Sequence, residues 1–193
     1  MNQPLHHHYK LYKPYGFVSQ FVSRQHKSYK KKFLGQFYDF HPDTMSVGRL
    51  DENSEGLLLL TTDGKLSHTI NSSGVEKEYY AQVDGLITSE ALLEIEKGVV
   101  LSIEGKSYQT KPCKAKIMAA PNLPETTQRM RHEGHGPTSW VSITLTEGKF
   151  RQVRKMTAAV GFPTLRLARY RVGNYTIDGM LAGDCIPVEE LLP

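Results

Sequence analysis

The chain has 193 residues, with 24 Lys and Arg against 20 Asp and Glu and a formal net charge of +4. It contains no run of about 18 apolar residues, which excludes a membrane-spanning helix. Its two cysteines, Cys113 and Cys185, are too few for a disulfide scaffold or a cysteine-rich zinc site. We therefore expect a cytoplasmic globular protein whose thiols are reduced.

The charge is unevenly distributed along the chain. Residues 1–38 hold seven Lys and Arg and no acid, and residues 126–171 hold nine Lys and Arg against two acids. The remaining residues hold eight basic and eighteen acidic side chains. Two basic blocks around an acidic middle indicate a polyanion as ligand, although a solvated basic surface would give the same counts.

The N-terminal half predicts strands alternating with short helices. In chain order, the expected elements are a flexible tail with three histidines (1–8), a strand interrupted at Pro14 and Gly16 (9–22), a lysine-rich loop, a strand (57–61), a helix (65–70), a strand (78–83) and a helix (89–97). Asp63-Gly64 is a strong signal for a tight turn. Ser89 is the expected N-cap of the second helix, and Gly98 its stop.

The C-terminal half predicts further strands and one helix. The expected elements are two or three strands (99–118) with a turn at Glu104-Gly105, a loop (121–137), a strand (140–146), a helix from Gly148 to Gly161, and a strand (165–172). Strands mixed with a few helices and joined mostly by short turns predict an α+β fold with a mainly antiparallel sheet.

Two polar clusters are candidates for chemistry. The first is Gly48-Arg49-Leu50-Asp51-Glu52, which directly precedes the apolar strand. Asp51 can be a turn residue or a catalytic carboxylate, and Arg49 can pair with it. The second is Glu147-Gly148-Lys149-Phe150-Arg151-Gln152-Val153-Arg154-Lys155. On a helix Arg151 and Lys155 share one face, so this stretch is either a solvated basic face or a phosphate-binding surface behind a glycine.

These clusters belong to an ordered series of motifs. Lys13-Pro14-Tyr15-Gly16, GRLDENSEGLLLLTTDG from Gly48, Lys77-Glu78-Tyr79 and EGKFRQVRKM from Glu147 follow one another as the motifs of the RsuA-type pseudouridine synthases do. The resemblance continues through GFPTLRLARYRVG, from Gly161 to Gly173. Pro137-Thr138-Ser139-Trp140 and GFPTLRL are similar to the members that modify large-subunit ribosomal RNA.

The resemblance implies a pseudouridine synthase catalytic fold over residues 9–193, in two lobes around a central cleft and without an S4 RNA-binding domain. It also implies that a specific uridine of ribosomal RNA is isomerised to pseudouridine without a cofactor or a metal. The base is detached from the ribose, turned, and rejoined through a ring carbon. The target uracil must be extruded from the RNA to be reached.

By the same motif match, Asp51 is the essential aspartate, as nucleophile or as electrostatic stabiliser of the ribose. Arg154 is its expected cationic partner, which would keep the carboxylate ionised, and Tyr79 packs against the flipped uracil. The expected substrate-binding residues are Lys13, Arg49, Lys77, Arg151 and Lys155.

The remaining predictions concern partners. Lys27–Lys32 is expected to be a basic flap on RNA or a disordered tether. The expected partner is large-subunit ribosomal RNA, free or in assembly intermediates, and the default state is a monomer away from membranes. The alternatives are a non-catalytic RNA-binding or ribosome-assembly protein on the same scaffold, and a glycosylase that would release free uracil.

Overall fold

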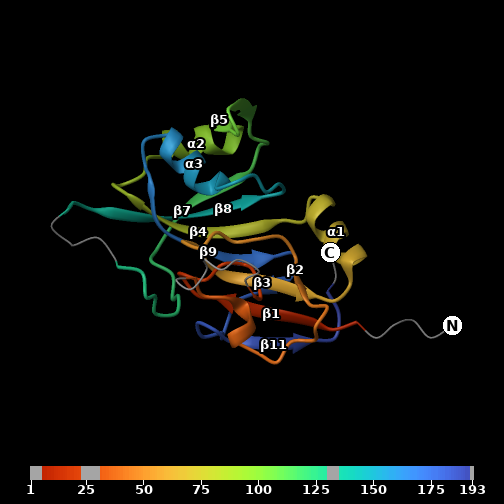
Figure 1. The fold of residues 1–193 in the computed structure, drawn as a ribbon. Helices are drawn as coiled ribbons and strands as arrows, with labels where there is room; N and C mark the ends of the chain where they lie inside the picture. Colours follow the sequence, from red (N-terminus) through yellow and green to blue (C-terminus); the bar gives the residue numbers. More distant parts are fainter. Residues whose placement is uncertain (1–5, 23–30, 130–134, 192–193) are drawn as a thin grey trace. The chain divides into compact units, whose positions relative to one another are not determined.

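The computed structural model describes residues 6–22, 31–129 and 135–191 (Figure 1). The chain divides into two compact units. Unit 1 comprises Met1–Val75, Pro124–Gln128 and Val172–Pro193, and unit 2 comprises Glu76–Leu123 and Arg129–Arg171. None of the helices in the described ranges has the length and apolar content that crossing a membrane requires.

Unit 1 is built on an antiparallel sheet with the strand order β11-β1-β3. Its elements are β1 (His8–Lys13), the 3-10 helix η1 (Leu34–Gln36), β2 (Met45–Ser46), β3 (Glu55–Thr61), α1 (Gly64–Ser72), β10 (Tyr175–Thr176) and β11 (Cys185–Val188). The register sets Tyr9 opposite Leu60 and Leu11 opposite Leu58. These side chains form a core with Leu34, against which Phe21, Phe37 and Phe40 pack.

Every residue of β3 is buried. A strand covered on both faces needs apolar side chains at consecutive positions, which explains the unbroken run of four leucines at 57–60. Because β3 follows Asp51 after only three residues, the best-buried strand of unit 1 directly supports the Asp51 segment.

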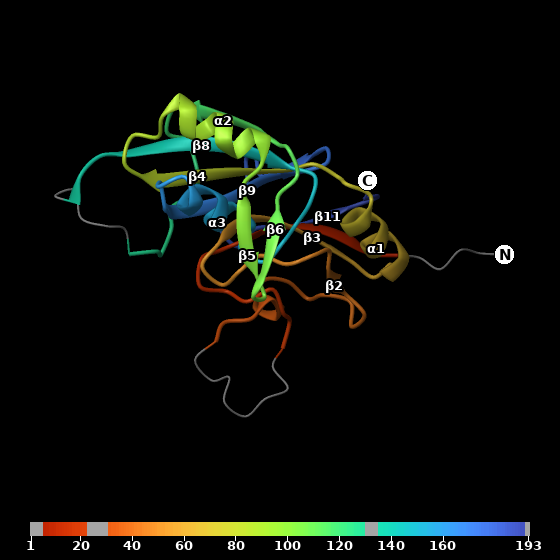
Figure 2. The same cartoon turned by 90° about the horizontal axis from the view of Figure 1, so that it is seen from above.

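Unit 2 has a sheet of order β9-β4-β8-β7, in which β8 pairs with β4 and β7 in antiparallel fashion. Its elements are β4 (Lys77–Asp84), α2 (Ser89–Lys97), β5 (Val100–Ile103), β6 (Lys106–Gln109), β7 (Lys114–Met118), β8 (Thr138–Leu145), α3 (Gln152–Ala159) and β9 (Thr164–Val172, whose last residue belongs to unit 1). Strands β5 and β6 form a separate antiparallel hairpin, and the two strands lie side by side in Figure 2.

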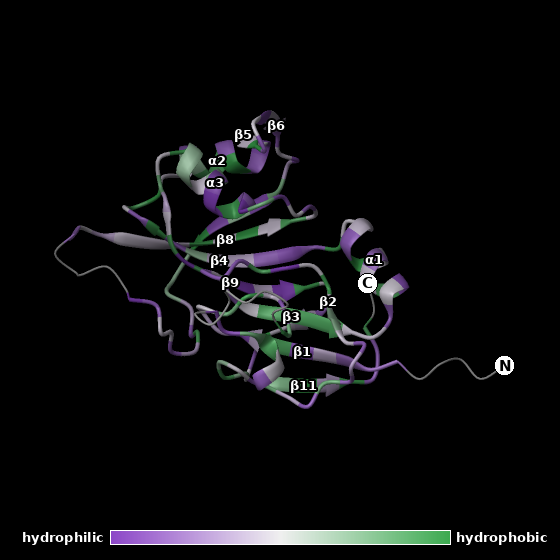
Figure 3. Cartoon of the chain, viewed as in Figure 1, coloured by the Kyte–Doolittle hydropathy of each residue, from purple (hydrophilic) through white to green (hydrophobic). Residues whose placement is uncertain are grey.

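The core of unit 2 lies between the sheet and its helices. Alternate residues of β4 and β8 supply Ala81, Val83, Val141 and Ile143, and the buried faces of the helices supply Leu92, Ile95, Val153 and Met156. Hydrophobic positions recur along β8 and α2 (Figure 3). The predicted α+β class with a mainly antiparallel sheet is therefore confirmed.

Several predicted boundaries were wrong. The opening strand ends at Lys13 and not at residue 22. The predicted tail extends too far, because His8 starts β1 and donates or accepts a hydrogen bond with Thr61 at 2.8 Å. His7 is also held, since its N–H donates to the Thr62 hydroxyl at 3.0 Å. Residues 1–5 lie outside the described ranges.

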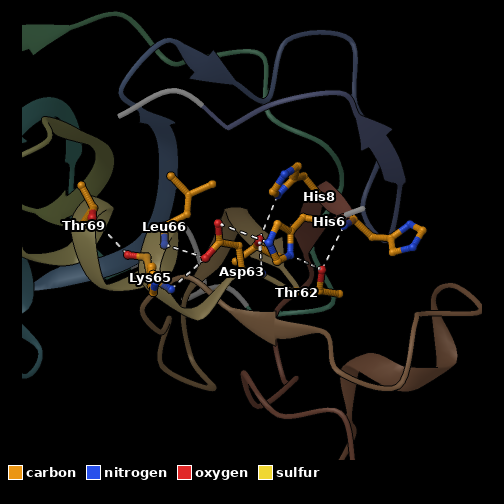
Figure 4. Close-up of polar contacts among 9 residues, drawn as sticks. His6, His8, Thr62, Asp63, Lys65, Leu66 and Thr69 are labelled. Atoms are coloured by element: carbon orange, nitrogen blue, oxygen red, sulfur yellow. Dashed lines mark hydrogen bonds and ion pairs between the residues drawn. The ribbon is translucent and has the colours of Figure 1, made fainter. Parts of the chain in front are cut away.

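Helix starts were also misplaced. At the predicted tight turn, Asp63 is the N-cap of α1, where its carboxylate accepts from the N–H groups of Lys65 and Leu66 at 2.8 and 3.0 Å (Figure 4). Asp-Gly serves both geometries, because Asp caps helices as readily as it makes turns. Thr88 and not Ser89 caps α2. Helix α3 begins at Gln152 rather than at Gly148.

Candidate active site

Asp51 lies in unit 1 on a hydrogen-bonded turn just before β3. The Ser54 N–H donates to the Asp51 carbonyl at 3.0 Å. Its neighbour Leu50 is buried, while Asp51 itself is partly exposed. Asp is favoured at the first position of such a turn, so the turn and catalytic readings of this residue are compatible. The segment thus presents a carboxylate next to a rigid strand.

The backbone on both sides of Asp51 is held by the segment after β1. The Ser19 hydroxyl accepts from the Leu50 N–H at 2.9 Å and donates to the Leu50 carbonyl at 2.8 Å. The Gly16 N–H donates to the Glu52 carbonyl at 2.8 Å. Residues some thirty positions earlier in the chain therefore fix the conformation around the carboxylate.

Lys13 is fully buried. Its ammonium donates to the carbonyls of Pro14 and Phe17 at 2.9 and 2.7 Å and so closes the Lys-Pro-Tyr-Gly loop on itself. An ammonium that is inaccessible to solvent and bonded to backbone carbonyls cannot reach the phosphates of an RNA. This geometry favours a structural role for Lys13 over the predicted contact with substrate.

The other basic residues of this part of unit 1 are exposed. Arg49 lies two residues before Asp51 on the surface. Lys31 pairs with Glu52 at 3.5 Å, and Lys32 lies over the Phe17 ring, 5.5 Å from its centroid. Of the predicted basic flap, residues 27–30 lie outside the described ranges. The C-terminal end of that segment is therefore held beside the Asp51 turn.

Lys77 and Tyr79 lie in unit 2 on β4, where they share one face of the strand with Ala81. Tyr79 is half-buried and packs against the core of unit 2. Lys77 is buried, and burial together with the nearby charge of Arg169 lowers its pKa. The predicted substrate contact of Lys77 would have to be made from the interior, whereas Tyr79 retains an exposed portion.

Arg154 lies in the first turns of α3. Its guanidinium Nη1 donates to the Thr164 carbonyl at 3.2 Å, which fastens the helix to β9. Arg151 is the N-cap of α3 in the left-handed conformation, with φ 52°. Lys155 donates to the Ser102 carbonyl at 2.7 Å and lies over the exposed ring of Phe150. Of the predicted basic pair, Lys155 therefore lies on the helix, whereas Arg151 directly precedes it as the N-cap.

Glu147 ties the segment before α3 to the β5–β6 hairpin. Its carboxylate accepts hydrogen bonds from the Tyr108 hydroxyl, from the Gln152 side chain and, at 3.0 Å, from the Lys111 N–H. Burial raises the pKa of Glu147, but these three donors outweigh burial and hold the pKa below 4.5. The Glu147 carboxylate is therefore ionised at neutral pH and anchors the loop that carries Phe150 and Arg151.

Part of the basic C-terminal block is used within unit 2. Arg171 pairs with Glu76 at 2.9 Å and with Glu78 at 3.1 Å, and Lys114 pairs with Glu76 at 2.7 Å. This network joins the ends of β4, β7 and β9. Its charges neutralise one another, so Arg171 contributes to the sheet rather than to an open basic surface.

The described residues contain no group of three or more His, Cys, Asp or Glu side chains that could hold a metal ion. Both cysteines are free and partly buried. Burial raises the pKa of Cys113 to about 11 and that of Cys185 to about 12, so neither thiol is a nucleophile at neutral pH.

The structure places the predicted site residues in two groups. Unit 1 holds Lys13, Arg49 and Asp51, and unit 2 holds Lys77, Tyr79, Arg151, Arg154 and Lys155. The sequence interpretation missed Ser19, Glu147 and Phe150. Phe150 is 62% exposed among basic neighbours, and that aromatic in a basic run was the one signal available.

Comparison with known proteins decides the family. The sequence model of the family described as RNA pseudouridylate synthase matches residues 7–159, most of the chain. The chain belongs to the RNA pseudouridylate synthase family. The resemblance drawn from the motifs is therefore confirmed, and the chain is a pseudouridine synthase, an isomerase.

The most informative relatives of this pseudouridine synthase carry one name. Ribosomal large subunit pseudouridine synthase E of Xanthomonas axonopodis is 40% identical over 173 residues, which cover 88% of this chain and 87% of that protein. The Vibrio parahaemolyticus protein of the same name is 39% identical, with 89% and 69% covered. A crystal structure of a pseudouridylate synthase matches with a TM-score of 0.74 at 26% identity, covering 95% of this chain and 70% of that one.

Proposed function

We propose that this pseudouridine synthase modifies a uridine of large-subunit ribosomal RNA. The observation that carries the proposal is the similarity to proteins named ribosomal large subunit pseudouridine synthase E over nearly the whole length of both chains. The proposal includes a cytoplasmic enzyme that acts as a monomer on free RNA or on an assembly intermediate.

The reaction is an isomerisation, which limits what the protein must supply. The bond between the ribose carbon and the uracil ring nitrogen breaks, and a bond from the same ribose carbon to a ring carbon forms. The proton lost from that ring carbon is balanced by the proton gained at the ring nitrogen. No oxidant, reductant or second substrate is consumed. The protein needs a carboxylate for the electron-poor ribose and groups that hold the detached base.

Asp51 is assigned the carboxylate role. Its rigid turn before β3 suits a group that must act on one ribose carbon, because a catalytic group has to be held close to its productive position. A carboxylate can attack the ribose or stabilise its positive charge, as in the retaining glycosidases. Arg154 and Tyr79 are assigned the supporting roles of cationic partner and uracil-packing side chain.

The RNA contacts are assigned to basic side chains and to one aromatic side chain. Arg49, Arg151 and Lys155 are proposed to contact phosphates, together with the lysines of residues 27–32. Exposed Phe150 is flanked by Lys149 and Arg151, which suits stacking on an unpaired base between two phosphate contacts. Lys13 is left out, because its ammonium is enclosed.

The test is incubation of the protein with unmodified large-subunit RNA, followed by chemical labelling of pseudouridine and primer extension. We expect one new modified site with the wild type and none with Asp51→Asn, which keeps the size of the side chain and removes its charge. Asp43→Asn is the matched control, since this exposed carboxylate pairs only with His41 among its charged neighbours in the described structure, at 3.9 Å.

The outcomes separate the candidate functions. RNA binding without modification by the wild type would favour the non-catalytic scaffold protein. Release of free uracil would indicate a glycosylase. Full turnover by Asp51→Asn would refute the role of Asp51 while leaving the activity itself established. A modified site confined to small-subunit RNA would refute the proposed substrate.

A further inference from the structure

The backbone around Asp51 is held by four hydrogen bonds over three consecutive residues. The Leu50 N–H and carbonyl both bond to the Ser19 hydroxyl, the Asp51 carbonyl accepts from Ser54, and the Glu52 carbonyl accepts from Gly16. Of these four bonds, the one from Ser54 is local. The other three come from the segment after β1.

The Ser19 hydroxyl carries two of these four bonds. Ser19 and Leu50 are both buried, with 8% and 7% of their surface exposed. Water therefore has little access to the Leu50 N–H and carbonyl if the hydroxyl is removed, and buried backbone groups need a partner. The two bonds join one side chain to both polar groups of one residue, so they fix the peptide planes on either side of Leu50.

The peptide after Leu50 is the one that enters Asp51. Its orientation sets the direction of the bond from Cα to Cβ in Asp51 and hence where the carboxylate points. A change in that plane moves the carboxyl oxygens, whereas the buried Leu50 side chain and β3 keep the segment folded. Loss of the Ser19 bonds is therefore expected to change the orientation of the Asp51 carboxylate while unit 1 stays folded.

We propose that Ser19 is a positioning residue for the catalytic carboxylate of Asp51. The proposal rests on the proposed function, in which Asp51 is catalytic. A displacement of about 1 Å can cost on the order of a hundredfold in rate. Ser19→Ala is accordingly expected to lower kcat by roughly ten- to a hundredfold, with the KM for RNA unchanged, because the Ser19 side chain is buried and its hydroxyl bonds to the Leu50 backbone.

The chain offers a matched control in Ser139. Its hydroxyl accepts from the Ile87 N–H at 3.0 Å and donates to the Gly85 carbonyl at 2.8 Å, so it also bonds to one backbone N–H and one backbone carbonyl, here of two residues in unit 2. Ser139→Ala is expected to lower the Tm and to leave kcat unchanged. Ser19→Thr keeps the hydroxyl and is expected to recover most of the kcat that Ser19→Ala loses.

The experiment measures kcat, KM and Tm for the wild type, Ser19→Ala, Ser19→Thr and Ser139→Ala, together with hydrogen exchange at the Leu50 amide. Faster Leu50 exchange and a lower kcat in Ser19→Ala alone would support the proposal. Equal kcat in Ser19→Ala and the wild type would overturn it, as would unchanged Leu50 exchange whatever the activity. A wild type that makes no pseudouridine would instead refute the proposed function.

Discussion

Replacing Glu147 with Gln tests whether one ionised carboxylate anchors the loop before α3. The substitution keeps the shape of the side chain and one acceptor oxygen. It removes the negative charge that accepts from Tyr108, Gln152 and the Lys111 N–H. The loop concerned carries Phe150 and Arg151, so the prediction links the stability of unit 2 to RNA contact.

The expected loss of stability in Glu147→Gln follows from the kinds of hydrogen bond that are weakened. A hydrogen bond to a charged group contributes about 1.5–3 kcal/mol, and a neutral one about 0.5–1.5 kcal/mol. Since the three bonds of Glu147 are partly solvated, weakening them should cost about 1–2 kcal/mol in total. For a chain of this size 1 kcal/mol shifts Tm by about 2–4 °C, so Glu147→Gln should lower Tm by about 2–8 °C.

The stabilisation that Glu147 provides depends on pH in a predictable direction. The folded-state pKa of Glu147 lies below the ordinary value of 4.5, so its stabilising contribution is present above about pH 4.5 and is lost as the pH falls through the folded pKa. The difference in Tm between the wild type and Glu147→Gln should therefore be full at pH 7.5 and become smaller as the pH falls below 4.5.

The assay is thermal unfolding at pH 7.5 and at pH 4, with Glu104→Gln as the control. Glu104 lies at the exposed β5–β6 turn, and its substitution should leave Tm within about 1 °C at either pH. The reasoning is refuted if Glu147→Gln melts with Glu104→Gln at pH 7.5, or if its deficit is as large at pH 4 as at pH 7.5.

Two further predictions concern RNA affinity and helix capping. Phe150→Ala should raise the Kd for substrate RNA by roughly 5- to 150-fold, from the loss of about 1–3 kcal/mol of base stacking, while Phe150→Trp stays close to the wild type. Leu93→Ala, at another exposed apolar position (51%), should leave the Kd unchanged in the same binding titration, and equal Kd values for both Ala variants would contradict the stacking role. Asp63→Ala should lower the free energy of unfolding by about 1 kcal/mol in urea, and Asp63→Ser should restore most of it; no loss would show that the cap of α1 contributes nothing.

The sequence predicted best those helices and strands whose apolar residues recur with a strong helical or alternating period. The Ala91, Leu92 and Ile95 stripe became the buried face of α2, and the alternation over 165–172 became β9 (Thr164–Val172). Boundaries failed where one residue type serves two geometries. Asp63 caps a helix where the dipeptide predicted a tight turn, and Gly148 lies four residues before the helix it was expected to start.

The charge pattern located the basic blocks, but it did not predict which of their side chains are buried, paired or exposed. Lys13 is enclosed by its own loop, Arg171 is neutralised by two glutamates, and Arg49 remains exposed. The sequence does not show whether the ammonium of a lysine is bonded to backbone carbonyls or exposed to water. Burial depends on contacts between distant segments, and these contacts have no local signature.

The sequence by itself determined the family, through four motifs in order, and the chemical types available for the reaction, above all the carboxylate of Asp51. Only the tertiary structure decided how that carboxylate is held. The bonds from Ser19 to Leu50 join residues 31 positions apart, and the Glu147 bond to Tyr108 spans 39. Such bonds form only after strands and loops have packed, because their geometry is set by the fold and not by neighbours in the chain.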